Sequence, residues 1–419
     1  MHPSHLPAVL WITLILFLAG CQSTPEPEAR WWRGNLHTHS LWSDGDDYPE
    51  MIVGWYVANG YDFVALSEHN VIAQGERWSE VDENRGGRPA FDRYLDEFGE
   101  GWVDQRVSGD TLFVRLRTLD EFRPLFEAPD SFLVITAEEL TDGFGGKPVH
   151  INVTNIQDFI PPQRGGSLRQ TMQNNVDAVL RQRDSTGVPM FPHINHPNFG
   201  WAMTAEDLLT LRGERFFEVY NGHPMVHNEG DSLRPGTERM WDIINTRRLL
   251  NGDPILLGLA VDDSHNYLEM GPAQSNAGRG WVMVRADTLS AVALVTALEA
   301  GDFYGTTGVE LADVRSDASG LSLEIRPEPG VTYTTTFYGT LAAHDTTSTP
   351  VQLPDGAYVS RHYSEDVGQV LATSDELNPR YDFTGAELYV RAKVVSSKPK
   401  ENPYREGEME TAWTQPAVR

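Results

Sequence analysis

Residues 35–45 read NLHTHSLWSDG, and three of them, His37, His39 and Asp44, carry side chains that bind metal ions. Side chains alternate along a strand, so the two histidines of an H-x-H pair lie on the same side and are placed to hold one cation. Asp44 lies on the turn that follows and can reach a neighbouring cation. Imidazole and carboxylate ligands together favour Zn, Mn or Fe over Ca. A lone H-x-H pair is more often two buried structural histidines, so the rest of the chain decides the interpretation.

Short apolar runs follow along the chain, and most of them end in further metal-binding or polar residues. We interpret these runs as buried parallel strands. They cover 62–66, 132–135, 149–153, 188–191, 216–220 and 254–261, and they lead to or contain His69, Glu139, His150, His196, Asn221, Asp263 and His265. Helical patterns at 49–58, 168–182, 237–247 and 288–300 separate them. Strands and helices in alternation predict an α/β fold, a β/α barrel whose functional groups gather at the carboxyl ends of the strands.

The pattern changes at two places along the chain. Residues 72–129 form a long insertion that is rich in charge, aromatics and glycine, with helical stretches expected at 93–98 and 118–127. Long insertions on a catalytic face often act as lids or specificity loops. From 311 to 419, alternating runs such as 321–325, 333–338 and 386–392 predict a small C-terminal antiparallel β domain behind the barrel. The barrel is therefore expected to span 34–310.

The amino-terminal segment predicts export and anchoring. Residues 8–20 form an apolar run that is too short to span a bilayer and ends in Leu-Ala-Gly-Cys at 18–21. This end resembles a bacterial lipoprotein signal, which implies a signal peptide over 1–20 and acylation of Cys21, although no Lys or Arg precedes the run. An ordinary secretory signal cut elsewhere is the alternative. Residues 21–33 then form a tether, and the protein is expected in the bacterial cell envelope, lipid-anchored and facing the periplasm or the exterior.

Charge and cysteine content exclude several classes of function. Sixty acidic residues against 33 basic ones give a net charge of −27, which repels nucleic acid, so no nucleic-acid partner is expected. Cys21 is the single cysteine, and its acylation leaves neither a disulfide nor a thiol nucleophile. A serine hydrolase is disfavoured as well, because the chain has no G-x-S-x-G motif.

Taken in chain order, these motifs resemble the polymerase-and-histidinol-phosphatase (PHP) family. They are H-x-H with Ser-Asp-Gly, Glu-His at 68–69, Glu139, single histidines, His-Pro at 196–197 and a closing D-x-H at 263–265, and they cover about two thirds of the chain. The resemblance implies a distorted seven-stranded β/α barrel that holds two or three divalent metal ions. Residues 138–141, 150–153, 218–222 and 412–416 resemble the branch of the family that includes carbamate-ester hydrolases.

The resemblance also implies a set of ligands for each metal. His37, His39, Glu139 and Asp263 would bind the first metal and form the catalytic group. Glu139 would bridge to a second metal, which Asp44 and His69 would also hold. The third metal would be held by His150, His196 and His265.

Some assignments have neighbours that compete for them. Glu138 competes with Glu139, His193 with His196, and Asp262 with Asp263; the family's motifs favour the second of each pair. Glu68, Glu218 and Asn221 are expected to orient ligands or shape the pocket. His223 and His227 lie on a loop and are expected to be solvated. Lys147 and Arg279 could steady an anionic substrate, but exposed surface charges are the favoured interpretation for both.

The expected activity is hydrolysis by metal-activated water. Bound cations lower the pKa of a water from 15.7 to about 7 and stabilise charge on the oxygens of the transition state. A small phosphate ester is the favoured substrate, attacked by a metal-bound hydroxide. A carboxyl or carbamate ester is the first alternative, because it needs the same ligands. A non-catalytic binding lipoprotein is the second alternative.

Overall fold

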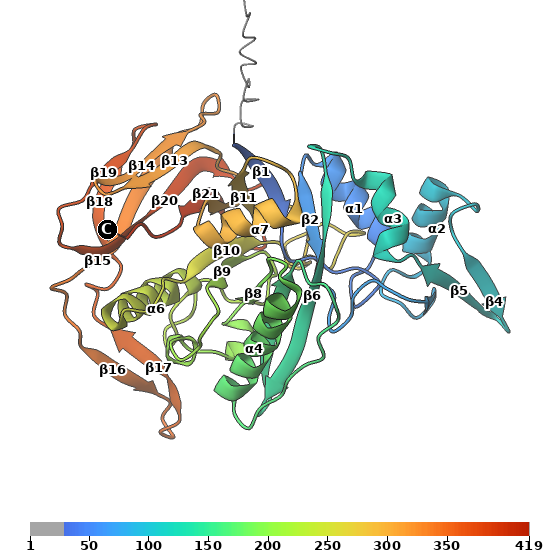
Figure 1. Ribbon diagram of the computed structural model, residues 1–419, viewed down its shortest axis with the longest axis horizontal. Helices are drawn as coiled ribbons and strands as arrows, with labels where there is room; N and C mark the ends of the chain where they lie inside the picture. The colour runs from blue at the N-terminus through green and yellow to red at the C-terminus, as the bar shows by residue number, and fades with distance from the viewer. Residues whose placement is uncertain (1–28, 419) are drawn as a thin grey trace, which may run out of the picture.

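The computed structural model describes residues 29–418 (Figure 1). The signal peptide, Cys21 and most of the tether lie outside these residues. Strand β1 (Arg30–Asn35) begins inside the stretch assigned to the tether, because Trp32 is buried in the core and the strand pairs antiparallel with β11 (Trp281–Ala286). Among the described residues, no helix has the length and apolar character needed to cross a membrane.

One mixed sheet of 13 strands runs through the molecule. Its order is β10 (Leu257–Val261), β9 (Phe216–Asn221), β8 (Phe191–Ile194), β7 (Lys147–Thr154), β6 (Leu133–Phe144), β2 (Phe63–Leu66), β1, β11, β12 (Phe303–Thr306), β21 (Met409–Thr414), β20 (Glu387–Pro399), β15 (Tyr333–Leu341) and β18 (Gln369–Ser374). Strands β1, β2 and β6 are parallel, and so are β8, β9 and β10. With the helices on its faces, this sheet confirms the predicted α/β class.

Strand β7 runs antiparallel to both of its neighbours, so the prediction of a parallel strand at 149–153 is wrong. Only Gly145 and Gly146 join β6 to β7, both with positive φ (62° and 81°). A connection of two residues can form a hairpin but cannot cross over to a parallel strand. His150 therefore lies near the start of β7, and Glu139 lies in the second half of β6. The antiparallel pairing brings these two side chains together.

The strand order is that of an open sheet, and a closed barrel is not confirmed. The sheet nevertheless curves so that the carboxyl ends of β1 and β10 meet. Thr38 and Ser264 form a parallel bridge there, with hydrogen bonds from His39 N to Ser264 O (3.0 Å) and from Asp263 N to His37 O (3.1 Å). This junction brings the H-x-H and D-x-H segments side by side.

The predicted helices are present as α1 (Pro49–Ala58), α4 (Leu168–Thr186), α6 (Thr237–Asn251) and α7 (Ala291–Ala300). Proline begins α1, and glycines with left-handed φ end the other three. Two short helices, α5 (Ala205–Leu208) and the 3-10 turn at Phe199–Trp201, were not predicted. The strand expected at 188–191 is shifted to 191–194, where it pairs with β7 and β9.

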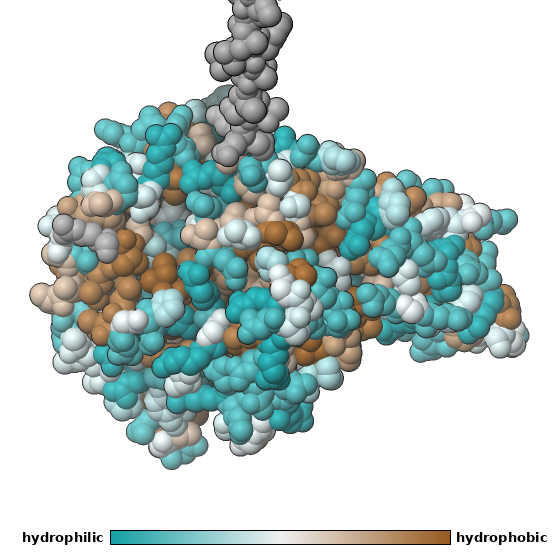
Figure 2. All heavy atoms as spheres, viewed as in Figure 1, coloured by the Kyte–Doolittle hydropathy of each residue, from teal (hydrophilic) through white to brown (hydrophobic). Residues whose placement is uncertain are grey.

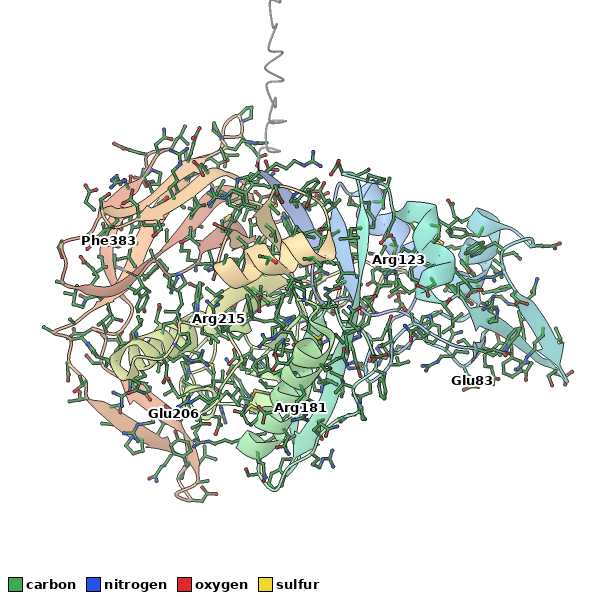
Figure 3. All side chains as sticks on the ribbon, viewed as in Figure 1. Glu83, Arg123, Arg181, Glu206, Arg215 and Phe383 are labelled. Carbon is green, nitrogen blue, oxygen red and sulfur yellow. The ribbon has the colours of Figure 1, made fainter. Side chains whose placement is uncertain are left out.

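The insertion at 72–129 is a folded unit at one end of the molecule (Figure 1). Its helices α2 (Gly87–Phe98) and α3 (Leu119–Phe126) overlap the predicted ones, but its antiparallel sheet of β3 (Arg77–Glu80), β5 (Thr111–Leu116) and β4 (Gln105–Ser108) was not predicted. Arg123, labelled in Figure 3, donates to Thr136 Oγ1 on β6 (3.0 Å). Tyr94 of α2 stacks on Tyr48, with ring centroids 4.1 Å apart. The insertion therefore shares a core with the main sheet.

The C-terminal strands are antiparallel as predicted, but four of them extend the main sheet, since β21 pairs with β12. A second sheet holds β13 (Leu311–Asp317), β14 (Gly320–Ile325) and β19 (Arg380–Asp382), and β16 (Ser348–Gln352) pairs with β17 (Tyr358–Tyr363). Hydrophilic side chains cover much of the face in Figure 2, with a hydrophobic area over α7, where Val292 is half exposed.

Candidate metal centre

The structure brings the nine predicted metal-binding residues into one cluster. Each comes from the end of a strand or from the facing parts of β6 and β7. They are His37, His39 and Asp44 after β1, His69 after β2, Glu139 in β6, His150 in β7, His196 after β8, and Asp263 and His265 after β10.

Four of these side chains converge on one point. His37 Nε2 lies 3.6 Å from Glu139 Oε2 and 3.3 Å from Asp263 Oδ1. His39 Nε2 lies 3.4 Å and 3.5 Å from the same two oxygens. Atoms held about 2.0–2.2 Å from a zinc ion in tetrahedral geometry are about 3.3–3.6 Å apart. The spacing of the four atoms therefore fits one shared cation.

The hydrogen bonding of these atoms gives a second test of fit. His37 Nε2, His39 Nε2, Glu139 Oε2, Asp44 Oδ1 and His150 Nδ1 are buried and have no hydrogen-bond partner among the described residues. Leaving a buried polar group without a partner costs about 1–3 kcal/mol, and more when it is charged. Several such atoms facing one another are stabilised when cations lie between them, so this donor set fits divalent metal ions.

A second group forms around Asp44. Its Oδ1 lies 3.4 Å from His69 Nε2 and 3.3 Å from His265 Nε2. The resemblance placed His265 with His150 and His196 instead, and the structure does not bring those three histidines together as one group. The reason is that Asp46 N donates to His265 O (2.8 Å), which ties the turn carrying Asp44 to the segment after β10.

Glu139 also belongs to two overlapping groups, one with His69 and His150 and one with His37 and His196. His150 Nδ1 lies 3.0 Å from Glu139 Oε1, and His196 Nε2 lies 3.8 Å from the same atom. Asn195 Nδ2 donates to this oxygen as well (2.7 Å) and fixes the carboxylate. With Oε2 facing His37 and His39, the Glu139 carboxylate is placed to bridge two cations.

Glu218 and Asn221 form hydrogen bonds to residues of the cluster. Glu218 Oε1 lies 2.6 Å from His37 Nδ1, which turns His37 Nε2 toward the cluster. Its Oε2 accepts from His196 N (2.7 Å) and from Asn221 Nδ2 (2.8 Å). Asn221 Nδ2 also donates to Asp263 Oδ2 (3.0 Å). Both residues therefore hydrogen-bond to residues of the cluster, and their role in orienting metal ligands stays a prediction.

Replacing Glu218 with glutamine is expected to lower the affinity for Zn²⁺ or Mn²⁺ about 10- to 100-fold, because an amide orients His37 less strongly and removes a negative charge. Competition with a chelating dye measures the affinity. The matched control is Glu206→Gln: Glu206, labelled in Figure 3, accepts from Tyr358 and Tyr363 and contacts no cluster residue. Equal affinities for the Glu218 variant and the wild type would contradict this role.

The three residues that compete with Glu139, Asp263 and His196 for a place in the cluster do not point into it. Glu138 accepts from Ile160 N (3.0 Å), and its burial raises its pKa to about 8. Asp262 is buried and accepts from the backbone N–H groups of residues 278–280. His193 lies behind His37, with Nε2 3.3 Å from Glu218 Oε1. The carboxylates of Glu139 and Asp263 therefore face the cluster, and His193 supports it from outside.

Glu68 and the two basic candidates lie away from the cluster. Glu68 accepts from the hydroxyl groups of Ser40 and Ser43, so it shapes the turn that leads to Asp44. Lys147 is exposed at the start of β7. Arg279 is fully buried and donates to the carbonyls of Gly222, Gly271 and Gln274, so the expectation of an exposed charge is wrong for it. Its donors are therefore used by backbone carbonyls of the turns at 222 and 271–274.

Two residues near the cluster were missed by sequence reasoning. Asn195 carries no metal-site pattern of its own, although it directly precedes His196. His223 was expected to be solvated, but it is half-buried, with its ring centroid 5.7 Å from that of His265. Met225 N donates to His223 Nδ1 (3.1 Å), which places the proton of the neutral ring on Nε2. His227 is exposed as expected and stacks on Trp201.

The cluster is a network of ionised carboxylates and histidines. Burial would lower the pKa of His37, but the carboxylates of Asp263, Glu218 and Glu139 hold it well above its ordinary value. Burial would also lower the pKa of His69, but the charge of the Glu139 carboxylate and its hydrogen bond to the ring raise that pKa to about 9. For His39, burial and the charges of His265 and His69 lower the pKa to about 3. Burial would raise the pKa values of Glu139 and Asp263, but the histidines hold both well below their ordinary range.

Metal binding is expected to release protons at pH 7. His37 and His69 have raised pKa values and are protonated there, whereas a metal requires the neutral imidazole. Apparent affinity should therefore rise as the pH increases toward 9, by about tenfold per pH unit for each proton released. Calorimetric titration with Zn²⁺ in two buffers of different ionisation enthalpy measures this. Binding heats that are equal in both buffers would contradict it.

No protein-family model and no curated protein matches the chain. Among solved structures, a two-domain protein from Bacteroides vulgatus that contains a predicted PHP-like metal-dependent phosphoesterase is 16% identical, with 94% of this chain and 100% of that chain covered and a TM-score of 0.42. A candidate metal-dependent phosphoesterase from Bifidobacterium adolescentis is 14% identical, with 57% of this chain and 89% of that chain covered and a TM-score of 0.29. Both likenesses are distant.

Proposed function

We propose that the chain is a PHP-type metal-dependent hydrolase that acts on a small phosphate ester. The observation that carries the proposal is the convergence of His37 Nε2, His39 Nε2 and Glu139 Oε2, which are buried and have no hydrogen-bond partner among the described residues, with Asp263 Oδ1 at spacings that fit one cation. The PHP motifs in chain order and the wider set of nine side chains support it. We also propose that the sheet corresponds to the distorted barrel of the PHP family. Within that family, we place the chain in the branch that includes carbamate-ester hydrolases.

Each part of the cluster has a task in this reaction. Divalent metals, when bound, supply a water of lowered pKa and positive charge for the oxygens of the ester. His37, His39 and Asp263 would hold the first ion, with Glu139 shared between it and a second. Asp44 would hold a further ion together with His69 and His265. The side chains of Asp44 and His69 are 34% and 24% exposed, whereas those of His37, His39 and Glu139 are fully buried, so the ester reaches the cluster from the side of Asp44 and His69.

The test is a series of three nitrophenyl substrates. The full-length protein, purified in mild detergent and reloaded with Mn²⁺ or Zn²⁺, is assayed with a phosphomonoester, a phosphodiester and a carboxyl or carbamate ester. His37→Ala serves as the blank. Turnover of a phosphate substrate that chelation abolishes and metal restores supports the proposal. Turnover of the carboxyl or carbamate ester alone would contradict the phosphoesterase proposal. It would indicate a carboxyl or carbamate ester hydrolase that uses the same metal-binding residues.

We also propose that Cys21 is lipidated and anchors the protein to the bacterial envelope, facing the periplasm or the exterior. The Leu-Ala-Gly-Cys sequence after a short apolar run supports this. The wild-type protein expressed in a Gram-negative host should enter the membrane fraction and incorporate labelled palmitate, whereas Cys21→Ala should do neither. Membrane association that survives Cys21→Ala would contradict the anchor.

A further inference from the structure

One basic side chain of the insertion lies against the open side of the cluster. Arg85 Nη2 is 3.4 Å from Asp44 Oδ2. Among the ion pairs of residues 29–418, Arg85 is the one arginine or lysine within 4.0 Å of a cluster carboxylate, since histidines make all the other ion pairs of Asp44, Glu139 and Asp263. Oδ1 of Asp44 meanwhile faces His69 and His265. The carboxylate thus has one oxygen toward the metal-binding histidines and the other toward the guanidinium.

The loop that carries Arg85 is fixed against the same turn. A Cβ at Gly86 would lie 2.3 Å from Asp46 O, so the backbone next to Arg85 touches the turn two residues after Asp44. Asn84 Oδ1 accepts from Gly87 N (2.8 Å), and Arg93 Nη1 on α2 lies 3.3 Å from Asp47 Oδ2. The insertion therefore holds the arginine in a set position beside the cluster.

Most of the hydrogen-bonding capacity of Arg85 is free. Its side chain is 57% exposed, and within the part of the chain that the structure describes it makes the ion pair with Asp44 and no hydrogen bond. A guanidinium carries five N–H donors in a planar fork that matches two oxygens of a phosphate. The chain as a whole carries a net charge of −27 and repels anions, so an arginine beside the cluster favours an anionic substrate by adding its positive charge to that of bound metal ions.

We propose that Arg85 binds the non-bridging oxygens of the substrate phosphate and makes the enzyme select phosphomonoesters. This inference rests on the proposed phosphoesterase function. A phosphomonoester carries about two negative charges at neutral pH and presents three terminal oxygens, so it gains most from a guanidinium beside the metals. A phosphodiester gains less, and a neutral carboxyl ester gains nothing. Arg85 is the specificity residue that the insertion contributes to the site.

The kinetic test compares Arg85→Ala and Arg85→Lys with Arg88→Ala, all in the full-length, metal-loaded protein. Arg88 is an exposed arginine of the same insertion that contacts no cluster carboxylate and so serves as the matched control. For nitrophenyl phosphate, kcat/KM should fall about 10- to 100-fold in Arg85→Ala, mainly through KM, in line with the loss of a charge-assisted hydrogen bond. Arg85→Lys should recover part of the loss. Turnover of nitrophenyl acetate should stay within about twofold of the wild type, as should all activities of Arg88→Ala.

A binding measurement separates recognition from turnover. Calorimetric titration of the metal-loaded protein with inorganic phosphate should give a Kd about 10- to 100-fold higher in Arg85→Ala than in the wild type, with unchanged metal content. Unchanged phosphate affinity and unchanged kcat/KM in Arg85→Ala would overturn the role of Arg85. An equal loss for all substrates, or the same loss in Arg88→Ala, would overturn it too, because it would indicate a structural effect. A wild-type protein that hydrolyses no phosphate ester would instead overturn the proposed function on which this role rests.

Discussion

Replacing Glu139 with glutamine is expected to lower kcat/KM for a phosphate ester about 10³-fold. Glu139 lies within 4.0 Å of the ring nitrogens of His37, His39, His69, His150 and His196. Its two oxygens face different groups of histidines, so an amide would remove the bridging charge from both. Loss of one group that stabilises a transition state already costs about 10²- to 10³-fold. Glu139 is therefore the single position with the largest expected effect on activity.

The neighbouring residue supplies the control for this prediction. Glu138 lies on the same strand but points away from the cluster, toward Ile160 N. Glu138→Gln should bind the same number of metal ions as the wild type and keep its activity within a few-fold, whereas Glu139→Gln should lose at least one ion. Elemental analysis and steady-state kinetics measure both quantities. Full activity in Glu139→Gln, or an equal loss in Glu138→Gln, would contradict the bridging role.

The second large effect concerns stability. Arg391 on β20 donates to both carboxylate oxygens of Asp242 on α6, from Nε (2.8 Å) and Nη2 (2.6 Å), and Tyr389 Oη donates to the same carboxylate (2.7 Å). Both members of the pair are buried. Replacing Arg391 with methionine keeps much of the volume but leaves Asp242 buried without its counter-charge. Breaking a buried pair in this way costs about 3–5 kcal/mol in the free energy of unfolding.

Urea or thermal unfolding of the full-length protein measures this loss. Arg380→Ala is the matched control on the neighbouring sheet, because Arg380 and Asp382 form an exposed pair. Exposed pairs contribute less than about 1 kcal/mol, so this variant should unfold close to the wild type. An Arg391→Met variant with an unchanged midpoint would contradict the stabilising role of the Arg391–Asp242 pair.

Helices and most strands were predictable because their signals are local. Pro49 begins α1, and glycines end α4, α6 and α7, so these boundaries follow from turn chemistry. The direction of β7 does not follow from the alternation of strands and helices, although Gly145-Gly146 between β6 and β7 is itself a hairpin signal. Whether a sheet closes depends on how strands far apart in sequence curve toward each other, which no local pattern specifies. The same holds for the pairing of β21 with β12.

The motifs were enough to predict which residues gather in the cluster, but not how the structure groups them. His265 joins Asp44 through the contact between Asp46 N and His265 O, a contact between segments more than 200 residues apart. Residues that act through ordinary hydrogen bonds carry no motif, which is why Asn195 was missed. Arg85 was missed for a related reason: it lies in an insertion that no metal-site pattern includes.

The central claim, a multi-metal centre at the nine residues, is tested most directly by anomalous diffraction from crystals of the protein soaked in Zn²⁺ or Mn²⁺. The account predicts two or three anomalous peaks, one among His37, His39, Glu139 and Asp263, and others beside Asp44 and beside Glu139 Oε1. Ligand distances should be about 2.0–2.2 Å for zinc. Crystals whose only peaks lie elsewhere, or that hold no metal at these side chains, would contradict the claim.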